Sequence, residues 1–457
     1  MSGSTWVHVA TLLNWNRPPV GIVRVEQEYC RWLLARNEPG VRFCLYDKGA
    51  RTFAEVPAER VAAHLAGPEA AAAYYAAQPK PELAGWKRAV KKAWYTFEPL
   101  LPAQWAAAAR KQMRLALHHA LQAKSDLRAW LAGPPAPPAP PPPDHAPAPP
   151  PPFAHSDRFV SLGLDWEYLD QARLYRLKQE YGLRVTLICY DVIPLLYPHL
   201  VVLPPGNFGA YAVDMAWCAD AVLCISEHTR DDFERVMARV GAPVPPTHVI
   251  RLGADIDLRQ PEAPPPALAG AAGERPFVLF VSTIERRKNH EILYRAWTRL
   301  RDGGLEPHRL VFVGMPGWGV TDLMNDLKLD PRVQDDVLLL NHVGDAELAW
   351  LYRHAAFTVF PSLYEGWGLP VVESLARGKF CLSSNAASLP EAGGEWAEYL
   401  DPWDLPAWVE RLGFYMRNPQ EVEARNARIA AEFTPPTWAA CAQTIHDVAM
   451  SAGAPRA

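Results

Sequence analysis

Short apolar runs alternate with longer amphipathic segments along most of this chain. Runs such as residues 41–47 and 185–190 are short and rich in β-branched and aromatic side chains, which favours strands over helices. Residues 22–33 instead repeat apolar side chains at helical spacing, which predicts an amphipathic helix. This alternation is typical of parallel sheets covered by helices.

The predicted strands fall into two sets, separated by a connector rich in Pro, Ala and Gly at residues 261–276. In the first half the predicted strands are 6–12, 41–47, 158–162, 185–190, 221–226 and 248–252. In the second half they are 277–282, 310–314, 337–341, 357–361, 379–383 and 398–400. Because 457 residues exceed the usual size of one domain, we expect two Rossmann-like domains.

Composition excludes several classes of protein. A net charge of −4 argues against a general nucleic-acid binder, whose surface would be basic. The seven cysteines are odd in number, scattered and without a Cys-x-x-Cys pair, which indicates a reducing compartment. Neither a signal peptide nor an apolar run long enough for a membrane span is present in the sequence. We therefore expect a cytoplasmic protein.

An insertion at residues 56–153 interrupts the first domain. Basic residues interleave with Trp, Leu and Tyr at helical spacing over residues 86–130, which suits an interfacial helix on an anionic membrane. The alternative is a helical hairpin packed on the domain or on a partner chain. Residues 134–152 are dominated by proline and predict an extended linker that contributes no core.

The most informative segment is 356–376, which combines an apolar strand, a glycine-containing turn and a helix whose first turn holds Pro370. The backbone N–H groups of the turn meet the positive end of the helix dipole, so the pattern predicts an anion site. Gly366 and Gly368 allow the main chain to approach a diphosphate closely. Glu365 and Glu373 flank the turn and suit sugar hydroxyls. The alternative is a structural corner with no ligand.

A second candidate segment lies about eighty residues earlier in the chain. The strand predicted at 277–282 is followed by a cationic loop, and then by an amphipathic helix at 291–300. Ligands of open α/β sheets bind at the carboxyl ends of strands, so Arg287 and Lys288 are candidates to neutralise a diphosphate. A solvated run of surface charge is the alternative.

The chain resembles glycosyltransferase family 4, and in particular the bacterial mannosyltransferases of surface-polysaccharide assembly. The resemblance covers nearly all of the C-terminal half. It rests on three motifs: Arg-Lys-Asn at 287–289, Tyr-Glu-Gly-Trp-Gly-Leu-Pro-Val-Val-Glu-Ser at 364–374, and Ala-Ser-Leu-Pro-Glu-Ala-Gly-Gly at 387–394.

The resemblance implies a fold and a division of the chain. The fold is α/β and of the GT-B type, with two Rossmann-like doubly wound parallel-sheet domains facing a cleft. Residues 1–260 would form the N-terminal, acceptor-side domain and residues 277–435 the nucleotide-sugar domain. Residues 436–457 would form a helix, predicted at 438–449, that crosses back to the first domain.

The resemblance also assigns roles to residues. Glu373 would bind the ribose, Glu365 the donor sugar and Lys288 the diphosphate. The base would lie against the segment His342-Val343-Gly344. Further donor contacts would come from the turn at Gly366, Trp367, Gly368 and Leu369, and from the N-terminal glycine loop at Gly21. For Gly21 an ordinary strand-to-helix turn is the alternative, and the sequence leaves open whether Arg24 faces the cleft or water.

The chain departs from the family pattern at two places. Ser282-Thr283 replaces a Gly-Arg pair, so Thr283 would face the donor and Arg287 would take over the phosphate contact. Tyr190-Asp191 replaces a His-Asp pair at a strand end, which leaves Asp191 as the candidate catalytic group there.

The implied activity is that of a retaining hexosyltransferase that needs neither metal nor cofactor, with Glu365, Lys288, Arg287 and Asp191 as catalytic residues. Fixed cations stabilise the charge that develops on the departing diphosphate. Asp255-Ile256-Asp257 has the spacing of a metal motif but is interpreted as structural.

The expected donor is a GDP-sugar, with mannose first and rhamnose or a uridine-linked hexose as alternatives. The expected acceptor is a saccharide or lipid-linked saccharide, bound by a cytoplasmic protein that is peripheral on the membrane. Two other functions stay open: a phosphorylase or sugar-phosphate synthase on the same fold, and a non-catalytic scaffold of a polysaccharide assembly complex.

Overall fold

A computed structural model describes residues 3–15, 21–77, 149–202, 205–255, 264 and 275–453. The chain divides into two compact units, residues 1–68 with 150–457, and residues 69–149. Within the second unit the description is limited almost to helix α4 (Pro68–Ala77). The membrane-binding helices predicted at 86–130 and most of the proline-rich linker lie outside the described residues.

The first sheet has seven strands in the order β3-β2-β1-β4-β5-β6-β7. All neighbours are parallel except β3, which pairs antiparallel with β2 at one edge. Its strands are β1 (Thr5–His8), β2 (Val41–Asp47), β3 (Thr52–Val56), β4 (Arg158–Ser161), β5 (Arg184–Cys189), β6 (Ala221–Cys224) and β7 (Thr247–Val249). Strand order reverses between β1 and β4, which is the Rossmann pattern.

The second sheet has six parallel strands in the order β10-β9-β8-β11-β12-β13. They are β8 (Phe277–Val281), β9 (Arg309–Val313), β10 (Val337–Leu340), β11 (Phe357–Phe360), β12 (Cys381–Ser384) and β13 (Glu398–Leu400). The central strands β8 and β11 are adjacent, with Val278 opposite Phe357. Here too the order reverses at the centre, so the loops that follow β8 and β11 lie side by side.

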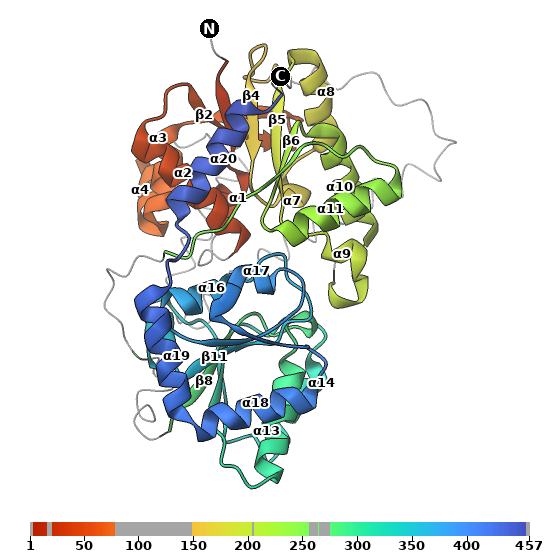
Figure 1. Cartoon of the computed structure of the whole chain (residues 1–457). Coiled ribbons are helices and arrows are strands. Elements are labelled where there is room, and N and C mark those ends of the chain that lie inside the picture. Colours follow the sequence, from red (N-terminus) through yellow and green to blue (C-terminus); the bar gives the residue numbers. More distant parts are fainter. Residues whose placement is uncertain are drawn as a thin grey trace, which may run out of the picture. The chain divides into compact units, whose positions relative to one another are not determined.

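The helices of the first half are α1 (Ala10–Asn14), α2 (Ile22–Arg36), α3 (Ala58–Ala66), α7 (Asp165–Tyr168), α8 (Gln171–Tyr181), α9 (Ile193–Leu196), η2 (Pro198–Leu200), α10 (Pro205–Cys218) and α11 (Glu227–Val240). Those of the second half are η3 (Arg286–Lys288), α13 (His290–Asp302), α14 (Thr321–Leu329), α15 (Asp345–His354), α16 (Leu369–Ala376), α17 (Leu389–Gly393), η4 (Gly394–Trp396), α18 (Leu405–Arg417), α19 (Pro419–Glu432) and α20 (Trp438–Ser451). Figure 1 labels most of them.

Helix α20 packs on the first sheet although it follows the strands of the second in the sequence. It lies against α2 and against β4, β5 and β6 (Figure 1). Its apolar face, including Trp438 and Ile445, joins the same buried cluster as Val25 and Leu33 of α2. The chain therefore completes the core of the first sheet with residues from its far end.

Local sequence explains where several helices begin. Ser226 caps α11, as predicted, because its Oγ accepts a hydrogen bond from the backbone N–H of Thr229 at 2.9 Å. Pro370 lies in the first turn of α16, where its missing N–H costs no helical hydrogen bond.

All seven cysteines are buried and unpaired.

Two predicted strands end earlier in the structure, and one strand was missed. Strand β7 (Thr247–Val249) is shorter than the predicted 248–252. The strand predicted at 6–12 ends at His8, because the apolar run continues into the short helix α1. Strand β3 was not predicted, since its sequence, Thr-Phe-Ala-Glu-Val, is short and Glu55 interrupts its apolar residues. A hairpin partner on β2 stabilises it at the sheet edge.

Candidate active site

The loops after β8 and β11 bring together the residues that the sequence singled out. Arg287 and Lys288 lie in η3, directly after β8. Glu365 lies in the turn after β11, and Glu373 lies on α16, which follows that turn. This is the point of the second sheet where strand order reverses, and ligands of open α/β sheets bind at such points.

The carboxylate of Glu365 is the centre of a buried charge cluster. It accepts hydrogen bonds from Arg287 Nη1 at 2.7 Å, Lys288 Nζ at 2.5 Å and Ser362 Oγ at 2.5 Å. Burial alone would raise the pKa of Glu365, but the two cations outweigh it and hold the pKa at about 2. Glu365 is therefore ionised at any physiological pH.

The two cations are themselves held in place. Arg287 also donates from Nη2 to Glu285 at 2.9 Å and from Nη1 to the carbonyl of Tyr364 at 2.7 Å. Burial and the charge of Arg287 lower the pKa of Lys288, while Glu365 opposes this shift. Two cations thus face two carboxylates, and an anion that enters the cluster must share Arg287 and Lys288 with Glu365.

Glu373 is largely buried and lies one helical turn into α16. Tyr352 on α15 donates its hydroxyl to Glu373 Oε2 at 3.3 Å. Arg24 on α2 forms an ion pair with Glu373 Oε1 at 3.5 Å. Burial raises the pKa of Glu373, and Arg24 acts in the opposite direction. The sequence left open whether Arg24 faces the cleft or water. In the structure its side chain is directed at Glu373.

The glycine-containing turn is fixed by close packing. A Cβ on Gly366 would lie 2.3 Å from the carbonyl oxygen of Tyr190, so no larger residue fits there. Gly368 has φ of +117° and caps α16. Ser388 Oγ donates to the carbonyls of Glu365 and Trp367, each at 2.9 Å. The carbonyls are thereby turned inward. Pro370 has no N–H, and the N–H of Val371 donates to the carbonyl of Gly368 at 3.0 Å, so the N–H groups that could meet an anion are those of the turn before Pro370.

Trp367 contributes to the turn through its backbone. Its side chain is buried in the core cluster of the first sheet, and the guanidinium of Arg251 lies 5.7 Å from its ring centroid. Leu369 packs against the same cluster. The predicted donor contacts of these two residues therefore fall to their N–H groups.

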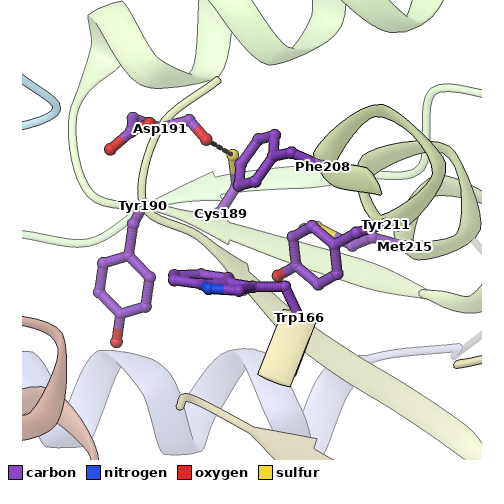
Figure 2. A pocket seen from close by; sticks show the side chains of 7 residues that line it. All are labelled: Trp166, Cys189, Tyr190, Asp191, Phe208, Tyr211 and Met215. Carbon is purple, nitrogen blue, oxygen red and sulfur yellow. Dashed lines mark hydrogen bonds between the residues drawn. The ribbon is translucent and has the colours of Figure 1, made fainter. Parts of the chain in front are cut away.

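Tyr190 and Asp191, which follow β5, have different environments. The buried hydroxyl of Tyr190 donates to the carbonyl of Leu162 at 2.6 Å and points away from Asp191 (Figure 2). Asp191 Oδ1 accepts from the backbone N–H of Ile193 at 3.0 Å. Burial raises the pKa of Asp191, and Arg287 opposes the shift. Tyr190 is a structural residue, whereas Asp191 lies within electrostatic reach of the Glu365 cluster.

A small cavity of about 20 Å³, with room for about one water molecule, lies beside Asp191. Aromatic rings dominate it: the centroid of Trp166 lies 5.9 Å from that of Phe208 and 5.6 Å from that of Tyr211 (Figure 2). Its lining is Trp166, Cys189, Tyr190, Asp191, Phe208, Tyr211 and Met215. Sequence analysis missed this pocket, although Phe208 and Tyr211 stand three apart on one face of α10.

The remaining predicted residues lie at strand or helix ends. Gly21 precedes α2 with φ of +44° and ψ of −111°, a conformation that glycine adopts most readily. Thr283 is exposed at the end of β8. His342 is exposed, with φ of +60°, and is followed by Val343. The N–H of Gly344, the N-cap of α15, donates to Glu347 at 2.8 Å.

The structure supports the structural interpretation of Asp255. Its Oδ1 accepts a hydrogen bond from the backbone N–H of Trp438 at 2.6 Å and so fixes the start of α20. Asp257 lies outside the described residues. In the described part of the chain, no three His, Cys, Asp or Glu side chains are grouped to hold a metal ion, and no helix is both long and apolar enough to cross a bilayer.

Residues 268–431 match the family model of glycosyl transferases group 1. These residues form a group 1 glycosyltransferase domain. The domain spans β8 to α19 and contains Arg287, Lys288, Glu365 and Glu373. The predicted relationship to glycosyltransferases is confirmed for this part of the chain.

Curated relatives extend the match beyond the group 1 glycosyltransferase domain. The chain is 28% identical over 252 residues to the serotype-specific mannosyltransferase WbdA of Escherichia coli, which covers 52% of this chain and 31% of the relative. It is 31% identical over 171 residues to the O-antigen chain mannosyltransferase B of E. coli, which covers 37% of this chain and 45% of the relative. The chain thus spans less than half the length of either relative.

The fold of the chain is similar over nearly its full length to that of a solved structure. The crystal structure of Anabaena Alr3699/HepE in complex with UDP aligns over 98% of this chain and 100% of that chain, with a TM-score of 0.54 and 13% sequence identity. Together with the two Rossmann-like sheets, this match confirms the predicted GT-B fold.

Proposed function

We propose that this protein transfers a hexose from a nucleoside-diphosphate sugar to a hydroxyl of a saccharide. The observation that carries the proposal is the buried cluster in which Arg287, Lys288 and Glu365 meet at the strand-order reversal of a group 1 glycosyltransferase domain. In such a cluster the cations can bind an anion, and the adjacent carboxylate can bind a sugar.

The donor is assigned to the second sheet. Its diphosphate contacts Lys288, Arg287 and the backbone N–H groups of the turn from Gly366 to Leu369 that leads into α16. Its ribose hydroxyls bind Glu373, and its base lies beside His342, Val343 and Gly344, which precede the helix that carries Tyr352. The transferred sugar lies against Glu365, whose ionised carboxylate accepts hydrogen bonds from ring hydroxyls.

Transfer breaks the bond between the anomeric carbon and the diphosphate oxygen and forms one to the acceptor oxygen. Negative charge grows on the diphosphate as it departs, so Arg287 and Lys288 stabilise the transition state more than the ground state. The proton of the acceptor hydroxyl passes to the departing diphosphate. Retention of configuration, with attack on the face from which the diphosphate leaves, is proposed from the resemblance to family 4.

The acceptor is assigned to the first sheet. The residues beside Asp191 include flat aromatic rings, which together with the carboxylate suit the mixed apolar and hydroxyl faces of a saccharide, although the cavity between them has room for only about one water molecule. The mannosyltransferase relatives, one of them an O-antigen chain mannosyltransferase, support mannose as the transferred sugar and an O-antigen-like polysaccharide as the product. GDP-mannose is therefore the first donor to test. Membrane association through residues 86–130 stays a prediction.

The test is release of nucleoside diphosphate from GDP-mannose, UDP-glucose and dTDP-rhamnose, with and without saccharide acceptors. We expect slow hydrolysis of one donor alone, and its loss in Lys288→Ala. Arg286→Ala is the matched control, because Arg286 neighbours Lys288 in η3 but its side chain is exposed. Turnover that requires inorganic phosphate would instead indicate a phosphorylase. Bound nucleotide with no turnover for any acceptor would indicate a scaffold.

A further inference from the structure

Helix α2 of the first sheet begins with an electrostatic pattern that suits an anion. Its N-cap is Gly21, and its first turn holds no acidic residue but does hold Arg24. Acidic side chains are normally favoured at this end of a helix, and a cation there is unfavourable unless an anion is close. Helix α16 of the second sheet likewise has no acidic residue in its first turn.

The Arg24 side chain is directed from α2 toward the second sheet. It is only 16% exposed, and its Nη1 lies 3.5 Å from Oε1 of Glu373, which is 12% exposed. A buried guanidinium is costly unless it is paired, so this ion pair determines where Arg24 lies. At 3.5 Å the contact is longer than an ordinary charge-assisted hydrogen bond. Glu373 thus sets the position of the Arg24 side chain but holds it through a long contact.

The charge balance of the site leaves room for Arg24. Arg287 and Lys288 are already matched by Glu285 and Glu365. A diphosphate adds negative charge to a cluster that also lies within electrostatic reach of Asp191, so a further cation favours its binding. Guanidinium is well suited to the task because its planar donors match two phosphate oxygens at once.

We propose that Arg24 belongs to the donor site and exchanges its partner when the donor binds. In the free protein it pairs with Glu373; when ribose hydroxyls occupy Glu373, the guanidinium of Arg24 contacts the diphosphate. The inference rests on the proposed function and adds to it a phosphate-binding residue contributed by the first sheet. Donor binding would then connect α2 with α16 through the ligand.

The test compares phosphate-dependent with phosphate-independent binding in the full-length protein. Affinities for GDP, UDP, guanosine and uridine are measured by calorimetry or competition for wild type, Arg24→Gln and Arg24→Lys. Arg31→Gln is the matched control, because Arg31 lies on the same helix, is half exposed and pairs locally with Glu28. Melting temperatures check that each variant is folded.

We expect Arg24→Gln to weaken binding of the preferred nucleoside diphosphate by tenfold or more, to leave nucleoside binding within about twofold, and to be partly rescued in Arg24→Lys. Equal losses for nucleoside and diphosphate would show that Arg24 merely positions Glu373, and unchanged affinities would show no role. Either result overturns the inference. If wild type binds neither GDP nor UDP, the proposed function fails first, so the two failures are distinguishable.

Discussion

Lys288 Nζ donates a hydrogen bond to Glu365 Oε1 at 2.5 Å, and this contact joins the loop after β8 to the turn after β11. Both side chains are nearly buried, at 13% and 9% exposed, so water screens the pair only weakly. Removing one partner of such a pair leaves an uncompensated charge, which costs more than the pair itself contributes.

The first prediction concerns the pH dependence of this cluster. The pKa of Glu365 is lowered to about 2, below its ordinary value of 4.5, so the ionised form stabilises the fold. This stabilisation is complete above pH 4.5 and is lost as the pH falls toward 2. We expect Glu365→Gln to lower the free energy of unfolding by on the order of 2–3 kcal/mol at pH 7 and by less at pH 3.5.

Urea unfolding of wild type and Glu365→Gln at pH 7 and pH 3.5 measures how much unfolding free energy the substitution removes at each pH. Glu395→Gln is the control, because Glu395 is exposed and its ion pair with Arg428 contributes little. A destabilisation by Glu365→Gln that is the same at both pH values would contradict the assigned charge state.

The second prediction concerns Gly366. An added Cβ would lie 2.3 Å from the carbonyl oxygen of Tyr190, so Gly366→Ala must push the turn away from the strand end that carries Asp191. We expect kcat/KM to fall at least 100-fold, since small displacements of reacting groups are costly. Gly209→Ala is the control, because a Cβ there makes an ordinary 3.4 Å contact with Leu195. Comparable activity of both variants would refute the prediction.

The third prediction concerns Glu391 on α17. Its two carboxylate oxygens accept hydrogen bonds from the backbone N–H groups of Glu227 and His228, each at 2.8 Å, at the positive end of α11. We expect Glu391→Gln to destabilise the protein by about 1 kcal/mol, because the charge interaction with the helix is lost. Thermal unfolding at low and high salt measures this. An effect that does not shrink with salt would argue against a charge interaction.

The fourth prediction separates Tyr190 from Asp191. Tyr190→Phe removes the hydrogen bond to the carbonyl of Leu162 and should cost about 1 kcal/mol of stability, with turnover within threefold of wild type. Asp191→Asn should reduce transfer to the acceptor far more than donor hydrolysis. Steady-state kinetics with and without acceptor measure both effects. A large loss of kcat in a well-folded Tyr190→Phe variant would assign Tyr190 a chemical role.

Sequence analysis predicted the two sheets because parallel strands buried on both faces are continuous apolar runs. It also predicted that Lys288 and Glu365 belong to one site, because both follow predicted parallel strands, at whose carboxyl ends ligands bind, and because the resemblance to family 4 gives both a role at the donor. Strand positions follow from local patterns, whereas the strand order that places β8 beside β11 is seen only in the structure.

Contacts between distant segments could not be predicted in this way. The side-chain direction of Arg24 depends on Glu373, which is far away in the sequence, and periodicity leaves both directions open. The aromatic pocket combines Trp166, Asp191 and Phe208 from three separate elements, and none of these segments has a pattern that differs from ordinary core. The hydrogen bond from the Tyr190 hydroxyl to the carbonyl of Leu162 likewise depends on tertiary packing and has no signal in the local sequence.

The position of α20 has a practical consequence for dissecting this molecule. Trp438 and Ile445 complete the core of the first sheet, so a fragment that ends before α20 would expose apolar surface in a domain that is otherwise intact. The N-terminal half expressed by itself should be poorly soluble, and a synthetic peptide with the sequence of α20 should rescue it in trans. Folding of the N-terminal half is thus expected to finish only after translation has reached α20, because the core of the first sheet is incomplete until then.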